Sequence, residues 1–224
     1  MAESARDHIL RTLAAAPGGE MPARPELPPF REQSMNRAEL LGRFTENLVE
    51  QTGTVHHVED AREVRQRLTE IVRVAGWKRV MVSEDDVLKT LALDTWSRDL
   101  GLTVLRPSQY KDRKAFKEAA FLKAEAGITG ADFAVAESGT LVLVHDRRQP
   151  RLVSLAPVCH VAVVPVERLV GVYEQVIESV FAHGKRPDHL SWITGPSMTA
   201  DIQATPFKGM HGPKHLTVIF LGKV

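Results

Sequence analysis

The sequence predicts an α/β protein built on a mainly parallel, open sheet that is covered by helices. Short apolar runs of strand length alternate with amphipathic runs of helical length through the first half of the chain. This alternation is typical of βαβ units. In the second half, several strand-like runs lie close together, with one long helical run among them. Both halves therefore favour a mainly parallel sheet with helices packed on its faces.

The amino-acid composition argues against several functional classes of protein. The chain has 224 residues, with 29 Lys and Arg against 28 Asp and Glu, and a formal net charge of +1. That balance argues against a general nucleic-acid or membrane-surface binder, which would carry a basic excess. With 43% hydrophobic and 25% charged residues, the chain has the composition of an ordinary globular protein. One large domain with an appendage fits this length.

The appendage is predicted at the N-terminus. Residues 4–16 form a short helix, with Ser4 and Asp7 in a capping pattern. Five prolines follow between residues 17 and 29, which indicates an extended arm. The arm could bind a partner or a second subunit, or pack on its own domain. We place the boundary between an arm at 1–35 and a domain at 36–224.

The elements of the first half follow in order from residue 36. Asn36 and Glu39 make a capping box that begins a helix. The next elements are a strand at 54–58, a helix at 60–75, a strand at 79–83, a helix from Ser83 to about Trp96 and a strand at 102–107.

The second half begins with a basic helix at 112–127. The later elements are strands at 132–137, 140–144, 160–166, 190–194 and 216–221, with a long helix from 167 to about 183. Only Ser138 and Gly139 separate two of the strands, which predicts a hairpin.

Cysteine content excludes several kinds of site. Cys159 is the one cysteine, so no intramolecular disulfide can form and the chain cannot hold an iron–sulfur cluster by itself. No apolar run reaches the roughly 18 residues of a membrane span, and the charged N-terminus does not resemble a secretory signal. We therefore expect a cytoplasmic protein that binds neither membrane nor nucleic acid.

Familiar cofactor motifs are missing. The sequence has no G-x-G-x-x-G after a strand, no G-x-x-x-x-G-K-[ST], no H-E-x-x-H and no G-x-S-x-G. His56 and His57 fall on a predicted strand and point to opposite faces, which suits joint metal ligation poorly. No metal site is expected.

Glycine-bearing polar segments at strand ends are the candidate ligand loops, because open α/β sheets bind ligands there. They are 127–132, 194–201 and 209–213. In the second, hydroxyls and main-chain N–H groups at a possible helix start suit a phosphate or carboxylate; a tight turn with an N-cap is the plainer interpretation. The candidate ligand-binding residues are Thr129, Asp132, Ser138, Gly139, Thr140, Gly195, Pro196, Ser197, Thr199, Asp201, His211 and Gly212.

Glu137 is the candidate catalytic residue. Strand alternation places it on one face with Phe133 and Val135, so its carboxylate must be paired, hydrogen-bonded or shifted in pKa. It could act as a base or a nucleophile, or it could accept hydrogen bonds from turn N–H groups. His160 fits a structural histidine better than a titrating one. The basic run at 147–151 fits solvated surface better than an anion gate.

Four segments together resemble the LUD-domain family, and within it the lactate utilization protein C (LutC) branch. They are GITGADFAVAESGTLVLV (127–144), CHVAVV (159–164), ITGPSMTADIQ (193–203) and HGPKHLTVIFL (211–221). Two positions depart from the family pattern. Ser138 stands where Thr is usual and keeps the hydroxyl, whereas Met198 stands where a basic residue is common and removes a charge.

The resemblance implies a fold like that of ribose-5-phosphate isomerase, glucosamine-phosphate deaminase and the CoA transferases. It also implies a role in oxidising L-lactate to pyruvate, beside LutA- and LutB-like partners that carry the iron–sulfur clusters, while this chain binds no cofactor. An accessory or anion-binding role is expected. The alternatives are a stand-alone enzyme acting on a phosphorylated or acyl-CoA substrate through Glu137, and a purely structural scaffold.

A first prediction follows from the single thiol. The purified chain should contain no stoichiometric iron and show no visible absorption, because a cluster needs about four ligands that are mostly thiolates. Metal analysis and an absorption spectrum measure this. A brown preparation with several irons per chain would overturn the interpretation, unless copies of the chain share a cluster.

Overall fold

The computed structural model describes residues 4–16, 35–182, 187–200 and 206–224. The chain separates into two compact units, 1–30 and 31–224. In the first, the predicted helix is confirmed as α1 (Ala5–Ala14), and the Ser4 hydroxyl accepts a hydrogen bond from the Asp7 N–H at 3.2 Å. The five prolines that define the predicted arm lie outside the described residues.

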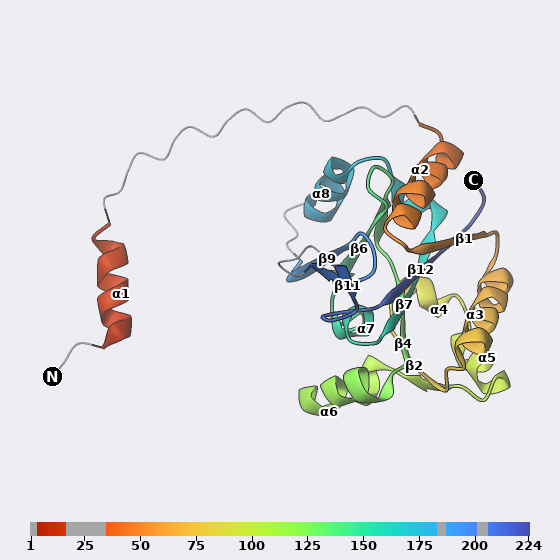
Figure 1. Ribbon diagram of the computed structural model, residues 1–224, viewed down its shortest axis with the longest axis horizontal. Helices are drawn as coiled ribbons and strands as arrows, with labels where there is room; N and C mark the ends of the chain where they lie inside the picture. The colour runs from red at the N-terminus through yellow and green to blue at the C-terminus, as the bar shows by residue number, and fades with distance from the viewer. Residues whose placement is uncertain (1–3, 17–34, 183–186, 201–205) are drawn as a thin grey trace. The chain divides into compact units, whose positions relative to one another are not determined.

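The second unit is organised around a six-stranded sheet in which every pairing is parallel, as predicted (Figure 1). Its strand order is β1-β12-β7-β4-β2-β3. The strands are β1 (Thr54–Val58), β2 (Arg79–Val82), β3 (Thr103–Leu105), β4 (Ala126–Gly130), β7 (Cys159–Pro165) and β12 (His215–Leu221).

A second sheet of four strands has the order β8-β5-β6-β9. Its strands are β5 (Phe133–Val135), β6 (Thr140–His145), β8 (Leu169–Val170) and β9 (His189–Ile193). β5 and β6 pair antiparallel across the Ser138–Gly139 turn, which confirms the predicted hairpin. A separate antiparallel pair joins β10 (Met198–Ala200) to β11 (Pro206–Lys208).

The helices cover the sheets in layers. They are α2 (Arg37–Glu50), α3 (Ala61–Ala75), α4 (Asp86–Lys89), α5 (Leu93–Asp99), α6 (Arg113–Glu118), α7 (Leu152–Leu155) and α8 (Tyr173–Phe181), with short 3-10 turns at Pro107–Gln109 and Val166–Arg168 and a π turn at Ala119–Lys123. α3, α4 and α5 bury one face of the six-stranded sheet. α2 and the second sheet bury the other, and α8 covers the far face of the second sheet.

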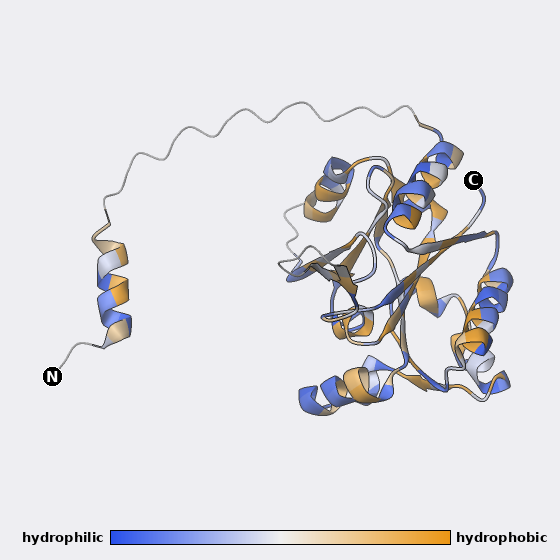
Figure 2. Cartoon of the chain, in the orientation of Figure 1, coloured by the Kyte–Doolittle hydropathy of each residue, from blue (hydrophilic) through white to orange (hydrophobic). Residues whose placement is uncertain are grey.

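Local patterning explains these layers. α2 and α3 each carry a hydrophobic and a hydrophilic side, visible as orange and blue stripes in Figure 2. The buried side of α2 includes Phe44, whose ring packs edge-on against Phe220 of β12 at 5.0 Å between centroids. Along β5, Ala134 packs toward the six-stranded sheet while Val135 packs toward α8. Such alternation lets one thin sheet serve two cores.

The segment at 126–130 was expected as a helix end and a ligand loop, and that expectation is wrong. It is β4, a fully buried strand between β2 and β7. Gly127 and Gly130 are untypical of a strand interior, so the sequence pattern does not predict a strand here. They are required because a Cβ on residue 127 would overlap the Val153 carbonyl, and one on residue 130 would overlap the Asp85 carboxylate. Here glycine permits close packing rather than a turn.

Three predicted helices also differ. The helix from Ser83 to Trp96 is two short helices, because Ala92 adopts a left-handed φ of 48° between them. The long helix from 167 is interrupted because Leu169 and Val170 pair with β5 as a strand. The basic helix at 112–127 ends in the π turn, and Ala126 already belongs to β4.

The tip of the β5–β6 hairpin gives the second prediction. Gly139 has a φ of +64°, and a Cβ there would lie 2.6 Å from the Leu48 main-chain nitrogen of α2. Gly139→Ala should lower the free energy of unfolding by roughly 2–4 kcal/mol, from left-handed strain plus overpacking. Urea denaturation measures the loss.

Gly101→Ala is the matched control. Gly101 has a similar φ of +63° but open space where its Cβ would project. That variant should lose only the strain, about 1–2 kcal/mol. Equal losses in the two variants would show that the hairpin tip does not press on α2.

Candidate functional site

The carboxyl ends of β2 and β4 form the point where the sheet topology diverges. After β2 the chain continues to β3 on one side, whereas after β4 it continues through the second sheet to β7 on the other. Open α/β sheets bind ligands in the crevice outside such a point, because the two connections leave it uncovered. The candidate site therefore lies at these two strand ends.

Asp85 joins the two strand ends. Its Oδ2 accepts hydrogen bonds from the Gly130 N–H at 2.9 Å and from the Ser83 hydroxyl at 2.5 Å. Its Oδ1 accepts one from the Leu88 N–H at 3.1 Å, which caps α4. The carboxylate is thus buried but satisfied. This cap, rather than the predicted Ser83, begins the helix.

The turn between β6 and α7 closes a third side of the site. The Glu84 N–H donates to the Arg148 carbonyl at 2.7 Å, and the Gln149 side-chain amide donates to the Gly130 carbonyl at 3.0 Å. The Arg148 guanidinium contacts Asp86 at 2.9 Å and Asp146 at 3.3 Å. These bonds fix the turn over the ends of β2 and β4.

Together these segments enclose a cavity of about 190 Å³, which we call the switch-point pocket. Its lining residues are Asp85, Asp86, Asp132, Val144, Asp146, Arg148, Gln149 and Arg168. Since water occupies about 30 Å³ in the liquid, the pocket has room for a few waters or one small organic acid.

Asp132 and Arg168 lie next to each other in the lining of the pocket. Asp132 Oδ2 accepts the Val144 N–H at 2.7 Å, and Asp132 Oδ1 lies 4.0 Å from Arg168 Nη1. Arg168 Nη1 donates to the Ala131 carbonyl at 2.9 Å. Among the described residues, the Nε and Nη2 groups of Arg168 have no hydrogen-bond partner. The guanidinium therefore has donors left for an anionic group.

Burial raises the pKa of Asp132 above its ordinary value. The Val144 N–H and Arg168 act in the opposite direction, and the neighbouring carboxylates of Asp85 and Asp146 raise the pKa further. A carboxylate with a raised pKa beside a guanidinium is suited to accept a proton from a bound hydroxyl.

The structure places the other predicted residues away from this pocket. Thr129 is buried in β4, where its hydroxyl lies 2.9 Å from His160 Nε2 of β7. His160 is also buried, in agreement with a structural histidine. Only Asp132 of the predicted ligand-binding residues lines the switch-point pocket.

Glu137 lies at the opposite end of β5 from Asp132. Its Oε1 accepts the Tyr173 N–H at 3.0 Å, where α8 begins. The sequence allowed either a catalytic or a structural role for Glu137. This contact is structural, because it satisfies a main-chain N–H at the start of a helix. Gly139, in the same turn, rests on α2.

Four hydroxyl groups form a cluster next to Glu137. Ser138 and Thr140 lie 2.8 Å apart, and both contact the Tyr173 hydroxyl, at 2.7 and 2.8 Å. Thr140 also contacts the Thr194 hydroxyl at 2.9 Å. The cluster ties the hairpin tip to α8 and to the end of β9.

The predicted anion loop meets the third glycine segment. The Ser197 N–H donates to the Pro213 carbonyl at 2.8 Å, and the Ser197 carbonyl accepts the Gly209 N–H at 2.8 Å. A Cβ on Gly212 would lie 3.1 Å from the Ser197 Cβ. The Ser197 N–H is therefore already used. The helix start predicted here is wrong, because β10 follows.

The remaining residues of this loop have different surroundings. Pro196 is buried, Gly195 lies against Gln51, Thr199 belongs to β10 and His211 is exposed. Asp201 lies outside the described residues.

Sequence reasoning missed Asp85 and Arg168, and assigned Arg148 to a surface cluster. Asp85 carried a usable signal, because it directly follows a predicted strand end. Arg168 carried none, since it fell in the first turn of a predicted helix.

Two kinds of feature are absent from the residues that the structure describes. No helix there has the length and apolar character needed to cross a membrane. In the same residues, no three acidic, histidine or cysteine side chains gather closely enough to hold a metal ion.

Comparison with known proteins identifies the family. The family model for the LUD domain matches residues 41–221, a span that contains both sheets and the switch-point pocket. The chain belongs to the LUD domain family. Its LUD domain is similar to the crystal structure of a DUF162 family protein from Deinococcus radiodurans, with a TM-score of 0.61, 25% identity and coverage of 84% of this chain and 99% of that one.

Several curated relatives of this LUD domain protein are named lactate utilization protein C. The chain is 31% identical to "Lactate utilization protein C" of Deinococcus radiodurans over 97% of this chain and 96% of the relative. It is also 31% identical to "Lactate utilization protein C 1" of Bacillus mycoides, over 71% of each chain. The predicted resemblance to the LUD-domain family and its LutC branch is thereby confirmed.

The buried His160 of the LUD domain generates the third prediction. Burial, with a smaller effect of His145, lowers the pKa of His160 to about 3. In the unfolded chain this histidine takes up a proton near pH 6.5, whereas in the folded chain it stays neutral until about pH 3. Stability should therefore fall as pH drops from about 6.5 toward 3, by up to about 1.4 kcal/mol per pH unit from this group.

Urea unfolding of wild type and His160→Gln between pH 7.5 and pH 4 measures this effect. Gln retains a hydrogen-bonding group for Thr129 but does not titrate, so the variant should lose stability less steeply on acidification. Profiles of equal slope would show that His160 takes up its proton without unfolding.

Proposed function

We propose that this chain is a subunit of a system that oxidises L-lactate to pyruvate, and that it binds the substrate in the switch-point pocket. The observation that carries the proposal is the 31% identity to "Lactate utilization protein C" over 97% of the chain. The pocket chemistry supports it independently, because lactate presents one carboxylate and one hydroxyl.

The residues of the pocket match these two groups. The unpartnered donors of Arg168 would bind the carboxylate, since a guanidinium pairs well with a planar anion. Asp132 would accept the hydrogen bond of the hydroxyl and take up its proton, helped by its raised pKa. The other guanidinium, that of Arg148, is already held by Asp86 and Asp146.

Electron transfer needs a partner in this proposal. Oxidation of lactate to pyruvate releases two electrons and two protons. The one thiol, Cys159, is half-buried, and burial raises its pKa, so it is a poor cluster ligand and lacks companions. We assign the electrons to iron–sulfur clusters of LutA- and LutB-like proteins, with this chain in the accessory, substrate-binding role.

The fourth prediction tests the substrate site. Arg168→Gln should weaken L-lactate binding roughly ten- to hundredfold, because a charge-assisted pair is lost. Isothermal titration calorimetry measures the affinity. Arg37→Gln is the matched control: Arg37 also donates Nη1 to a main-chain carbonyl, that of Leu169, yet it does not line the switch-point pocket. It should bind lactate as wild type does.

Asp132→Asn separates binding from chemistry. The variant should bind lactate within a few-fold of wild type but fail to restore growth on L-lactate in cells that lack the gene. Because Asn carries no charge at this buried position, the folded variant should be at least as stable as wild type near pH 7. Growth equal to wild type would remove Asp132 from the mechanism.

The loop at 194–201 is the competing anion site. If the double variant Ser197→Ala, Thr199→Val weakens lactate binding and Arg168→Gln does not, the ligand binds at this loop instead. Co-purification of the chain at native expression level, followed by iron analysis, tests the partners. Iron-free eluates would contradict the proposed assembly.

A further inference from the structure

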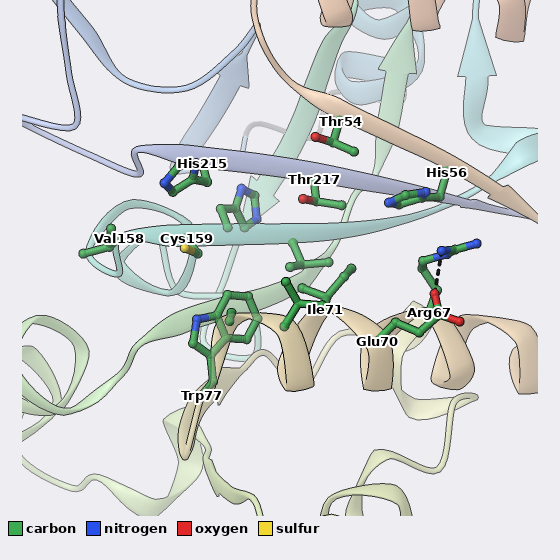
Figure 3. Close-up of a pocket in the computed structure, with 14 residues that line it drawn as sticks. Thr54, His56, Arg67, Glu70, Ile71, Trp77, Val158, Cys159, His215 and Thr217 are labelled. Carbon is green, nitrogen blue, oxygen red and sulfur yellow. Dashed lines mark hydrogen bonds and ion pairs between the residues drawn. The ribbon is translucent and has the colours of Figure 1, made fainter.

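A second and larger cavity lies at the other end of the six-stranded sheet. It has a volume of about 610 Å³ and opens between α3 and the amino ends of β1, β7 and β12 (Figure 3). We call it the amino-end groove. Because the strands are parallel, this groove and the switch-point pocket lie at opposite ends of the sheet.

The sheet surface inside the groove carries polar side chains. Toward the carboxyl ends of the strands, the face that α3 covers is apolar and includes Val58 and Ile219. Toward the amino ends the same face carries Thr54 and His56 on β1, and His215 and Thr217 on β12. The hydrogen-bonding side chains that β1 and β12 bring to the groove are thus Thr54, His56, His215 and Thr217.

These four side chains are available to a ligand. Thr54 pairs with Thr217 across the two strands, so their hydroxyls lie side by side. Within the part of the chain that the structure describes, none of the four side chains makes a hydrogen bond. Polar groups that converge on an open cavity without partners mark a binding site more often than a core.

The opposite wall is apolar. Ile71, Val74 and Ala75 of α3 line it, followed by Trp77 just beyond the helix. Figure 3 shows Ile71 and Trp77 on the helix side of the groove, facing the strands that carry Thr54 and Thr217. Val74 is 91% exposed. This wall offers an indole ring and aliphatic surface to the groove.

The charges of the groove cancel. Arg67 and Glu70 of α3 form an ion pair at 2.5 Å, drawn as a dashed line in Figure 3. Burial, with Arg67 nearby, lowers the pKa of His56, which favours its neutral ring. Neutral imidazoles and hydroxyls can both donate and accept hydrogen bonds. An uncharged ligand with mixed donors and acceptors is the best match.

We propose that the amino-end groove binds an uncharged nitrogen heterocycle whose edge carries both carbonyl and N–H groups. Its polar edge contacts Thr54 and Thr217, and its ring packs on Trp77. The volume of about 610 Å³ leaves room for such a ring system, and the indole of Trp77 offers a face on which it can stack. A ligand recognised mainly through phosphate would find a single Arg and no Lys in the described lining, and the charge of that Arg67 is already balanced by Glu70. This site is independent of lactate binding.

Riboflavin is the probe for the fifth prediction, because its fused ring carries such an edge and its fluorescence is quenched by a stacked indole. The full-length wild type should quench riboflavin saturably in the micromolar range. Thr54→Val and Thr217→Val should each weaken binding roughly three- to tenfold, by loss of one hydroxyl hydrogen bond. Thr103→Val is the matched control, an exposed strand threonine of β3 outside the groove, and should bind as wild type does.

Two more measurements locate the ring and its edge. Trp77→Phe should keep an aromatic wall while losing most of the quenching amplitude. Menadione has carbonyl groups but no N–H edge and should bind at least tenfold more weakly than riboflavin.

Three results would overturn the proposal. One is the absence of binding to folded wild type by riboflavin and by uridine, each at millimolar concentration. The second is riboflavin binding that both threonine variants and Trp77→Phe leave unchanged, which would place the ligand elsewhere. The third is menadione binding as tight as that of riboflavin, which would exclude recognition of a mixed edge.

Discussion

The Asp85 carboxylate is the contact on which the rest of the site depends. It holds the ends of β2 and β4 together through the Gly130 N–H, and it caps α4 at the same time. A single buried acid thus fixes a strand pair, a helix start and the rim of the switch-point pocket. The Asp85 carboxylate accepts hydrogen bonds from three donors, which explains why a charged group is tolerated at this buried position.

The two ends of the sheet differ because their coverings differ. At the carboxyl ends, the β6–α7 turn and Arg168 close over the strands and leave a small, charged pocket. At the amino ends, α3 stops at Ala75 before it has covered β1 and β12, which leaves a wide groove of mixed character. One sheet therefore offers two chemically unlike cavities, and a ligand in one need not exclude a ligand in the other.

Sequence reasoning succeeded where the signal is local. The Asn36 capping box and the hairpin at Ser138 each depend on a few neighbouring residues, and both are present. It failed at β4, because close packing against distant residues requires the glycines that disguise the strand. The switch-point pocket was out of reach for the same reason: only the fold brings Arg168 next to Asp132. The family resemblance could be recognised from the sequence because its motifs are contiguous and do not depend on which residues the fold brings together.

The β5–β6 hairpin also fixes where the chain tolerates changes of length. Its base holds Asp132 at the pocket and its tip rests on α2, so the distance between the two is set by the number of residues in each strand. Inserting or deleting one residue in β5 would turn Ala134 toward α8 and Val135 toward the six-stranded sheet. It would also withdraw the Asp132 carboxylate from the switch-point pocket. Natural insertions within this family should therefore fall outside residues 132–144.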